Sequence, residues 1–192
     1  MTYNQEIYRK LIHITSVSIP ISYWFLFDRS TMLWILLIAS AAILVGEILR
    51  LIIPFFDEIF SIIFGKIIRE REKSGITGAS YTLLGSLITI WIFEKEVAIF
   101  ALIVLAICDS TAALVGIKWG KSPLLNKSVQ GTMTFLSIAL VIVFVVPVFP
   151  KVAGICSVFV ITVVELLPSP VNDNLLIPLT AAVSFSIVNL II

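Results

Sequence analysis

Three carboxylates occupy positions from which they could serve phosphoryl chemistry. Asp109 lies in the apolar run 97–117, about 12 Å from the polar end of that run at about 1.5 Å of helix per residue. A carboxylate at that depth needs a polar cavity or a charged partner. Glu165 and Asp173 flank a polar connection. Because carboxylates opposite lysines are typical of sites for Mg²⁺ and nucleotide phosphates, the pattern predicts Mg²⁺ at Asp109 and Asp173 and a catalytic role for Glu165.

A glycine-containing basic turn follows Asp109. Gly116 and Gly120 share its helical face, and Lys121 and Ser122 come directly after them. This is not a P-loop, because only three residues separate the two glycines and an apolar helix, rather than a strand, precedes them. Small residues here allow a second helix, or a phosphate, to approach the backbone closely.

A second basic turn begins the next apolar run. It places Lys127 and Ser128 before Gly131 and Thr132. A helix N-terminus with a lysine and hydroxyls is a natural anion site. The alternative is that Ser128 is an ordinary N-cap and that Lys127 only contributes surface charge. Asp173 and Asn174, near the start of the last run, could also be no more than capping residues.

Two further polar clusters lie near the ends of apolar runs. Glu6, Arg9, Lys10 and His13 share one helical face, on which Arg9 and Lys10 could simply extend toward water. His13, the only histidine, lies one turn inside the apolar run and is a catalytic candidate. Glu47 and Arg50 are three residues apart, so that an ion pair within one helix is sufficient to explain them.

The composition determines which class of protein must position these residues. The chain has 192 residues, of which 59% are apolar and 13% charged, and its mean hydropathy is +1.12. A soluble domain usually has about 25% charged residues. The composition therefore excludes a soluble globular protein, a disordered chain and a nucleic-acid-binding protein, and predicts one integral membrane domain over residues 1–192.

Seven apolar runs are close to the roughly 20 residues that a membrane-spanning helix needs. We therefore predict an all-α, polytopic membrane helix bundle with about seven transmembrane helices. The segment 54–73 has apolar residues at helical spacing, and we expect either an amphipathic helix at the cytoplasmic headgroups or a plain connecting helix. The runs are 11–27, 31–53, 76–93, 97–117, 132–149, 152–167 and 175–192.

The connections between these runs differ in charge. The side that holds the N-terminus carries nine basic residues and the opposite side carries three. By the positive-inside rule, the N-terminus and the candidate site are cytoplasmic and the C-terminus is outside. The basic residues on the first side are Arg9, Lys10, Lys66, Arg69, Arg71, Lys73, Lys118, Lys121 and Lys127.

Taken together and in order, these motifs resemble the CTP-dependent lipid-alcohol kinase family, which includes dolichol, polyprenol and phytol kinases and a CTP-dependent diacylglycerol kinase. Any one motif is weak, but the ordered set covers nearly the whole chain. The matching elements are Arg9-Lys10-x-x-His13, Glu47-x-x-Arg50, Gly78-Ala79-Ser80-Tyr81-x-x-x-Gly85, Asp109-x-x-Ala112-Ala113-x-x-Gly116-x-x-x-Gly120, Lys127-Ser128-x-x-Gly131-Thr132 and Asp173-Asn174-x-x-x-Pro178.

The resemblance implies transfer of the γ-phosphate of CTP to a lipid alcohol of the polyprenol or dolichol type, or to a shorter prenol, with CDP as the second product. It implies membrane lipids as surroundings and no nucleic-acid partner. Glu47, Arg50, Gly78 and Gly85 are then structural or possible site residues. The expected nucleotide-binding residues are Arg9, Lys10, Gly116, Gly120, Lys121, Lys127, Ser128, Gly131, Thr132 and Asn174.

Three alternatives remain open at this point. Parts of the pattern are also similar to phosphatidate cytidylyltransferases and CDP-archaeol synthases, which transfer CMP from CTP, although the chain lacks the serine-proline-lysine-lysine stretch of the bacterial enzymes. An ion-coupled transporter would also place carboxylates in its helices, but it should be polar near the midplane and accessible from both faces. A structural scaffold would leave Asp109 unexplained.

Overall fold

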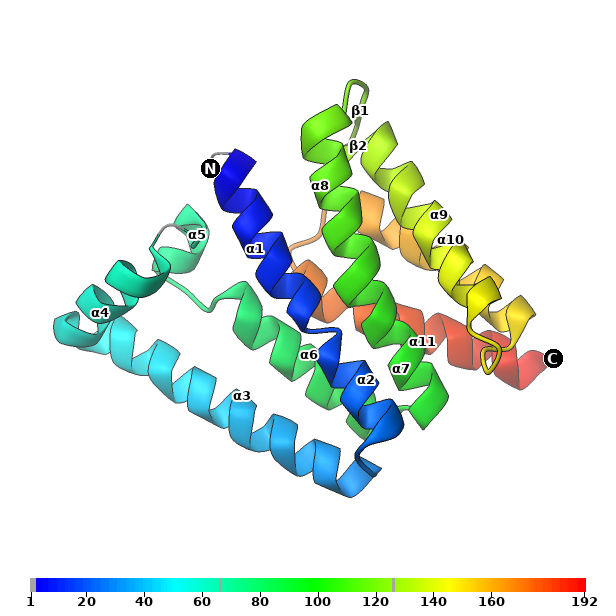
Figure 1. Cartoon of the computed structure of the whole chain (residues 1–192), viewed down its shortest axis with the longest axis horizontal. Coiled ribbons are helices and arrows are strands. Elements are labelled where there is room, and N and C mark those ends of the chain that lie inside the picture. The colour runs from blue at the N-terminus through cyan, green and yellow to red at the C-terminus, as the bar shows by residue number, and fades with distance from the viewer. Residues whose placement is uncertain (1–2, 66, 126) are drawn as a thin grey trace.

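The protein is all-helical apart from one short hairpin (Figure 1). The computed structural model describes residues 3–65, 67–125 and 127–192. Lys66 and the side chain of Arg71, both counted above, lie outside the described part. The first six elements are α1 (Tyr3–Thr15), α2 (Ser18–Phe25), α3 (Arg29–Ile52), α4 (Pro54–Phe64), α5 (Glu70–Lys73) and α6 (Gly78–Ile92).

The second half of the chain contains a π-helical segment and the hairpin. Its elements are α7 (Lys95–Ile103), the π-helix η1 (Val104–Asp109), α8 (Ser110–Trp119), β1 (Pro123–Leu124), β2 (Lys127–Ser128), α9 (Val129–Val145), α10 (Lys151–Leu166) and α11 (Asp173–Ile191). The two strands pair antiparallel, with Leu124 opposite Lys127.

Every predicted apolar run contains helix, but the predicted count of seven membrane spans is not confirmed. Three helices in the described part of the chain are long and apolar enough to cross a membrane, namely Arg29–Ile52, Lys95–Trp119 and Asp173–Ile191. The helices α6 and α9 have 15 and 17 residues. The first run is divided between α1 and α2, because Pro20 has no N–H to continue the helix from the preceding turn.

The segment 54–73 is also divided. It forms α4 and the short α5 rather than one amphipathic helix. No residue of α4 is buried, and Ile62 and Ile63 are among its most exposed side chains. Of the two helices in this segment, α4 carries the exposed apolar side chains that the sequence predicts.

The helix formed by α7, η1 and α8 lies at the centre of the bundle, and 78% of its apolar window is buried. It packs against α1, α2, α6, α9 and α11. Phe100 on α7 contacts Phe149 and Phe185 with ring centroids 5.3 and 4.9 Å apart, which closes the core at one end. Figure 1 shows that the start of α1, α5 and the hairpin lie at the opposite end, which we call the polar end, away from the end of α11.

Candidate active site

A cavity of about 860 Å³ opens at the polar end. Its walls come from α1, the α5–α6 region, α8, the hairpin, α9 and the α10–α11 connection, so that segments far apart in the sequence meet there. Nine charged side chains line it among the residues that the structure describes: Glu6, Lys10, Arg69, Glu72, Asp109, Lys121, Lys127, Glu165 and Asp173.

Asp109 joins the central helix to α1. It is the last residue of η1 and is only 5% exposed. A π-helical turn is wider than an α-helical one and changes the direction of the side chains that follow, which is why such turns are frequent at functional sites. Lys10 donates a hydrogen bond to Asp109 Oδ2, and His13 Nε2 lies 3.7 Å from the same oxygen. The structure thus brings together the polar face predicted for α1 and the predicted carboxylate.

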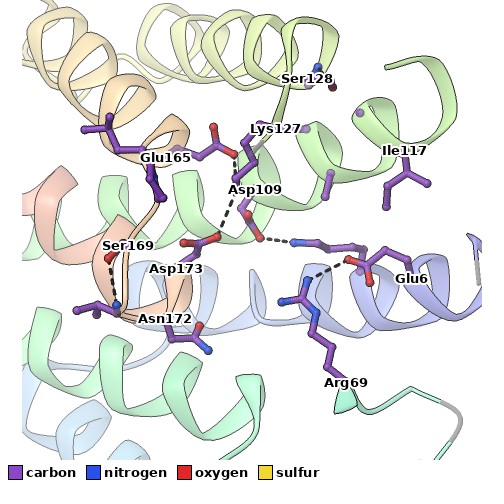
Figure 2. A pocket seen from close by; sticks show the side chains of 18 of the residues that line it. Glu6, Arg69, Asp109, Ile117, Lys127, Ser128, Glu165, Ser169, Asn172 and Asp173 are labelled. Carbon is purple, nitrogen blue, oxygen red and sulfur yellow. Dashed lines mark hydrogen bonds and ion pairs between the residues drawn. The ribbon is translucent and has the colours of Figure 1, made fainter. Parts of the chain in front are cut away.

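Lys127 joins the other two candidate carboxylates. The hairpin turns the chain back after Leu125, which has a positive φ of 51°. Lys127 Nζ then lies 2.8 Å from Glu165 Oε1 and 3.3 Å from Asp173 Oδ2 (Figure 2). Burial opposes the charge on Lys127, but the two carboxylates outweigh it and hold the pKa of Lys127 above its usual value. Lys127 is therefore a cation at neutral pH.

Glu6 forms a second, smaller charge group at the mouth of the cavity. Arg9 Nε donates to Glu6 Oε2 at 3.0 Å, and Arg69 lies 3.4 Å from Glu6 Oε1. Burial raises the pKa of Glu6, but Arg9, Arg69 and Lys10 together outweigh this and leave the pKa below its usual value. Arg9 is not among the lining residues, and Glu6 and Arg69 are there instead.

The glycines between Asp109 and Thr132 serve helix packing as well as the cavity. A Cβ atom on Gly116 would lie 2.9 Å from Ser128 Oγ, and one on Gly131 would lie 3.0 Å from the Ala112 carbonyl oxygen. Ser128 Oγ accepts a hydrogen bond from the Gly131 N–H at 3.1 Å, so Ser128 is the N-cap of α9. Gly116, Gly131 and Ser128 all line the cavity, as do Gly120 and Lys121.

The Glu47–Arg50 pair lies outside the cavity and holds one of its walls. Arg50 donates to Glu47 at 2.7 Å and to the backbone carbonyls of Glu72 and Gly75 at 2.9 and 2.5 Å. Glu47 accepts from the Thr77 N–H and hydroxyl and from the Ser80 hydroxyl. We call these residues the clamp: Glu47, Arg50, Glu72, Gly75, Thr77 and Ser80.

Asn174 also has a structural position. Its amide donates to the Gly78 carbonyl at 2.8 Å, and a Cβ on Gly85 would lie 2.6 Å from the Asn174 carbonyl oxygen. These contacts join α6 to α11, and none of the three residues lines the cavity. As its N-cap, α11 uses Asn172, whose side chain accepts from the Asn174 N–H.

Three predicted site residues carry a buried polar atom without a hydrogen-bond partner in the described part of the chain. These atoms are His13 Nε2, Thr132 Oγ1 and Glu165 Oε2. Of the three residues, only Glu165 lines the cavity. A native structure normally satisfies such groups, so each of them is a candidate contact for a bound molecule.

Some lining residues were not predicted. Glu6 was placed by its spacing on the helical face of Arg9, Lys10 and His13, but no role in the site was predicted for it. Tyr81 stands inside one of the matching motifs. Arg69 and Glu72 gave no such signal, because in sequence they belong to the polar face of a segment interpreted as an interfacial helix.

The lining residues fit a divalent cation that arrives with phosphates. No group of three or more His, Cys, Asp and Glu side chains suited to a metal occurs within residues 3–65, 67–125 and 127–192. Mg²⁺, however, is often held by only one or two carboxylates together with substrate phosphates. Asp109 and Asp173 both line the cavity and are available for this. The lining also has more acidic than basic side chains, so a bare triphosphate would be repelled without a cation.

Sequence comparisons identify one relative that matches nearly the whole chain and others that match part of it. An uncharacterized protein of Rickettsia prowazekii is 32% identical over 93% of this chain and 92% of its own length. The CTP-dependent diacylglycerol kinase 1 of Schizosaccharomyces pombe is 34% identical over 46% of this chain and 42% of its own length. The enzyme of the same name from Saccharomyces cerevisiae is 27% identical over 71% of this chain and 48% of its own length.

The chain thus spans less than half the length of the yeast kinases that it matches. No protein-family model and no solved structure matches it.

Proposed function

We propose, from the similarity of the chain to the CTP-dependent diacylglycerol kinases of yeasts, that it is a CTP-dependent lipid kinase that transfers the γ-phosphate of CTP to the hydroxyl of a lipid alcohol. The observation that carries this proposal is the cavity at the polar end, where Lys10 and Lys127 meet Asp109, Glu165 and Asp173. Phosphoryl transfer needs positioning and charge neutralisation more than covalent help from the protein.

The proposed roles follow from the contacts. Asp109 and Asp173 would hold Mg²⁺, which neutralises charge on the phosphates. Lys10 and Lys127 would turn from these carboxylates toward phosphate oxygens, and Lys121 adds a third lining cation. Lys10 and Lys127 each have a carboxylate partner when the phosphates are away, so that neither charge is buried alone.

The acceptor is proposed as a lipid alcohol that reaches the cavity from the surrounding lipid. The names of the yeast relatives favour diacylglycerol. The motif resemblance alone pointed to a polyprenol or dolichol, which is the second candidate. Exposed apolar side chains such as Ile117, which also lines the cavity, offer a surface for an acyl or prenyl chain.

Labelled CTP tests the reaction directly. The purified protein in lipid nanodiscs is incubated with γ-labelled or α-labelled CTP, Mg²⁺, and diacylglycerol, a polyprenol or phosphatidate. We expect label from the γ position in diacylglycerol or the polyprenol. Lipid labelled from the α position would instead identify a cytidylyltransferase. No labelled lipid, combined with cation flux in sealed liposomes, would favour the transporter alternative.

The same protein can test the proposed orientation. We propose that the polar end faces the cytoplasm, from the excess of basic residues on that side. A cysteine introduced at Lys118, which is exposed at the polar end, should react with an impermeant reagent only after the membrane is opened. If this position is labelled in intact cells, the polar end faces the outside and the proposed orientation is wrong.

A further inference from the structure

Glu165 differs from every other carboxylate of the cavity in how its two oxygens are used. It lies at the end of α10 and is 5% exposed. Its Oε1 pairs with Lys127 at 2.8 Å, whereas its Oε2 is buried without a hydrogen-bond partner among the described residues. Leaving a buried acceptor unpaired costs about 1–3 kcal/mol, and more for a charged group. A donor from a bound molecule would remove that cost.

The other lining carboxylates have no such oxygen. The two oxygens of Glu72 accept from the N–H groups of Gly78 and Arg69, each at 3.1 Å. Asp109 accepts from Lys10. Asp173 has a side chain that is 43% exposed, so water can reach it. Among the lining carboxylates that the structure describes, Glu165 alone therefore has a buried oxygen without a hydrogen-bond partner.

We infer that Glu165 is the general base of the reaction, an inference that rests on the proposed kinase function. The hydroxyl of the lipid alcohol donates its hydrogen bond to Glu165 Oε2. As the alcohol oxygen forms its bond to the γ-phosphorus, the bond from that phosphorus to the β–γ bridging oxygen breaks and CDP leaves. The hydroxyl proton moves to Glu165 Oε2 and is later released to water, so that atoms and charge balance.

Lys127 would couple this step to nucleotide binding. In the structure it pairs with Oε1 of Glu165 and also faces Asp173, while Asp109 lies nearby. The cation favours the charged form of Glu165, whereas the burial of the side chain opposes it. When Lys127 turns to a phosphate, Glu165 loses the cation that competes with the proton for its carboxylate.

The substitution Glu165→Gln tests the inference, because glutamine keeps the volume and an acceptor for Lys127 but cannot take the proton. We expect kcat to fall on the order of 10²–10⁴-fold, the usual contribution of a general base, with KM for CTP nearly unchanged. In the wild type, protonation of Glu165 at low pH should reduce the rate. We call this fall in rate at low pH the acidic limb. The residual activity of Glu165→Gln should lack it.

Glu72→Gln is the matched control, since Glu72 is equally buried at the same cavity but its two oxygens are occupied by backbone N–H groups. This variant should lower the melting temperature and keep the acidic limb. The inference is overturned if Glu165→Gln retains near-normal kcat, if it raises only KM for CTP, or if the acidic limb persists in it. Equal loss of the limb in Glu72→Gln would also overturn it.

Failure of this inference can be separated from failure of the proposed function. If the wild-type protein transfers γ-label to a lipid alcohol and Glu165→Gln does so at the same rate, only the base is wrong. If the wild type transfers no γ-label to any of the alcohols, the kinase proposal itself has failed.

Discussion

Two clusters of charged residues lie at the polar end, and they differ in how completely the hydrogen bonds of their buried members are satisfied. In the clamp, Arg50 and Glu47 bind each other and also backbone and hydroxyl groups of the 72–80 segment. The second cluster, which we call the cavity cluster, consists of Lys10, Asp109, Lys127, Glu165 and Asp173. It borders open space, and one of its buried oxygens has no partner in the described chain.

This difference in hydrogen bonding distinguishes residues with a structural role from residues of the proposed site, which residue type alone does not do. Both clusters contain acidic and basic side chains near the ends of apolar helices, and both belong to motifs of the family pattern. A fully bonded cluster stabilises one conformation, because any change leaves a buried group unpaired. A cluster that lies beside a cavity and has an unused hydrogen-bond acceptor can exchange contacts within the protein for contacts with a ligand. We therefore propose that the clamp holds the cavity wall in place and that the cavity cluster takes part in the reaction.

The largest effect is expected for Asp109→Asn in the cavity cluster. Asparagine keeps the volume and an acceptor for Lys10 but removes the charge that would hold Mg²⁺. We expect lipid phosphorylation to fall on the order of 10²–10³-fold or more. Transfer of γ-label to lipid, measured over a range of Mg²⁺ concentrations, checks this. Near-normal turnover would remove Asp109 from the site.

Arg50→Ala in the clamp should have a large effect on stability rather than on the chemical step. Removing one partner of a buried pair costs about 3–5 kcal/mol, because the other charge stays buried. Thermal unfolding in detergent should show a large fall in melting temperature. Arg29→Ala is the control, since Arg29 is exposed at the other end of α3. An Arg50→Ala protein as stable as Arg29→Ala would contradict a structural clamp.

Lys127→Ala should have an intermediate effect. A lost hydrogen bond to a charged group costs about 1.5–3 kcal/mol, which corresponds to a rise in KM for CTP of roughly tenfold or more. Lys118→Ala is the matched control, because Lys118 is exposed over the Trp119 ring and does not line the cavity. Equal KM values for the two variants would show that Lys127 binds no phosphate.

The smallest effects concern two glycines. Gly131→Ala should lower stability by about 1–3 kcal/mol, because its Cβ would lie 3.0 Å from the Ala112 carbonyl oxygen where α8 and α9 cross. Gly46→Ala should raise stability by about 1 kcal/mol, because nothing lies within 4 Å of its Cβ and alanine favours a helix. Melting temperatures that move in the same direction would argue against close packing at Gly131.

Much of the candidate site could be predicted from residue type and spacing. Asp109, Lys10, Lys127, Glu165 and Asp173 stood out because charged residues beside apolar runs need a partner or a function, and all of them line one cavity. The roles assigned to them stay predictions until the variants are measured. The family resemblance is confirmed by the yeast relatives.

Other features depended on contacts that spacing does not encode. Arg9 was predicted to hold phosphate and instead binds Glu6, while Arg69 reaches the cavity mouth through the α4–α6 connection. Thr132 and Asn174 lie beside the cavity lining rather than in it. The first run is divided near Pro20, whereas α3, the helix formed by α7, η1 and α8, and α11 are longer than the predicted runs.

The sequence by itself determined an all-helical chain of apolar runs whose charged residues gather on one side, because helical periodicity and hydropathy are local properties. It also determined which carboxylates are too deep to be ordinary surface groups. Only the tertiary structure decided which buried charges bind each other and which face a cavity. That choice depends on how α1, η1, the hairpin and α10 pack, and one turn of π-helix or one short hairpin is enough to change a side chain's partners.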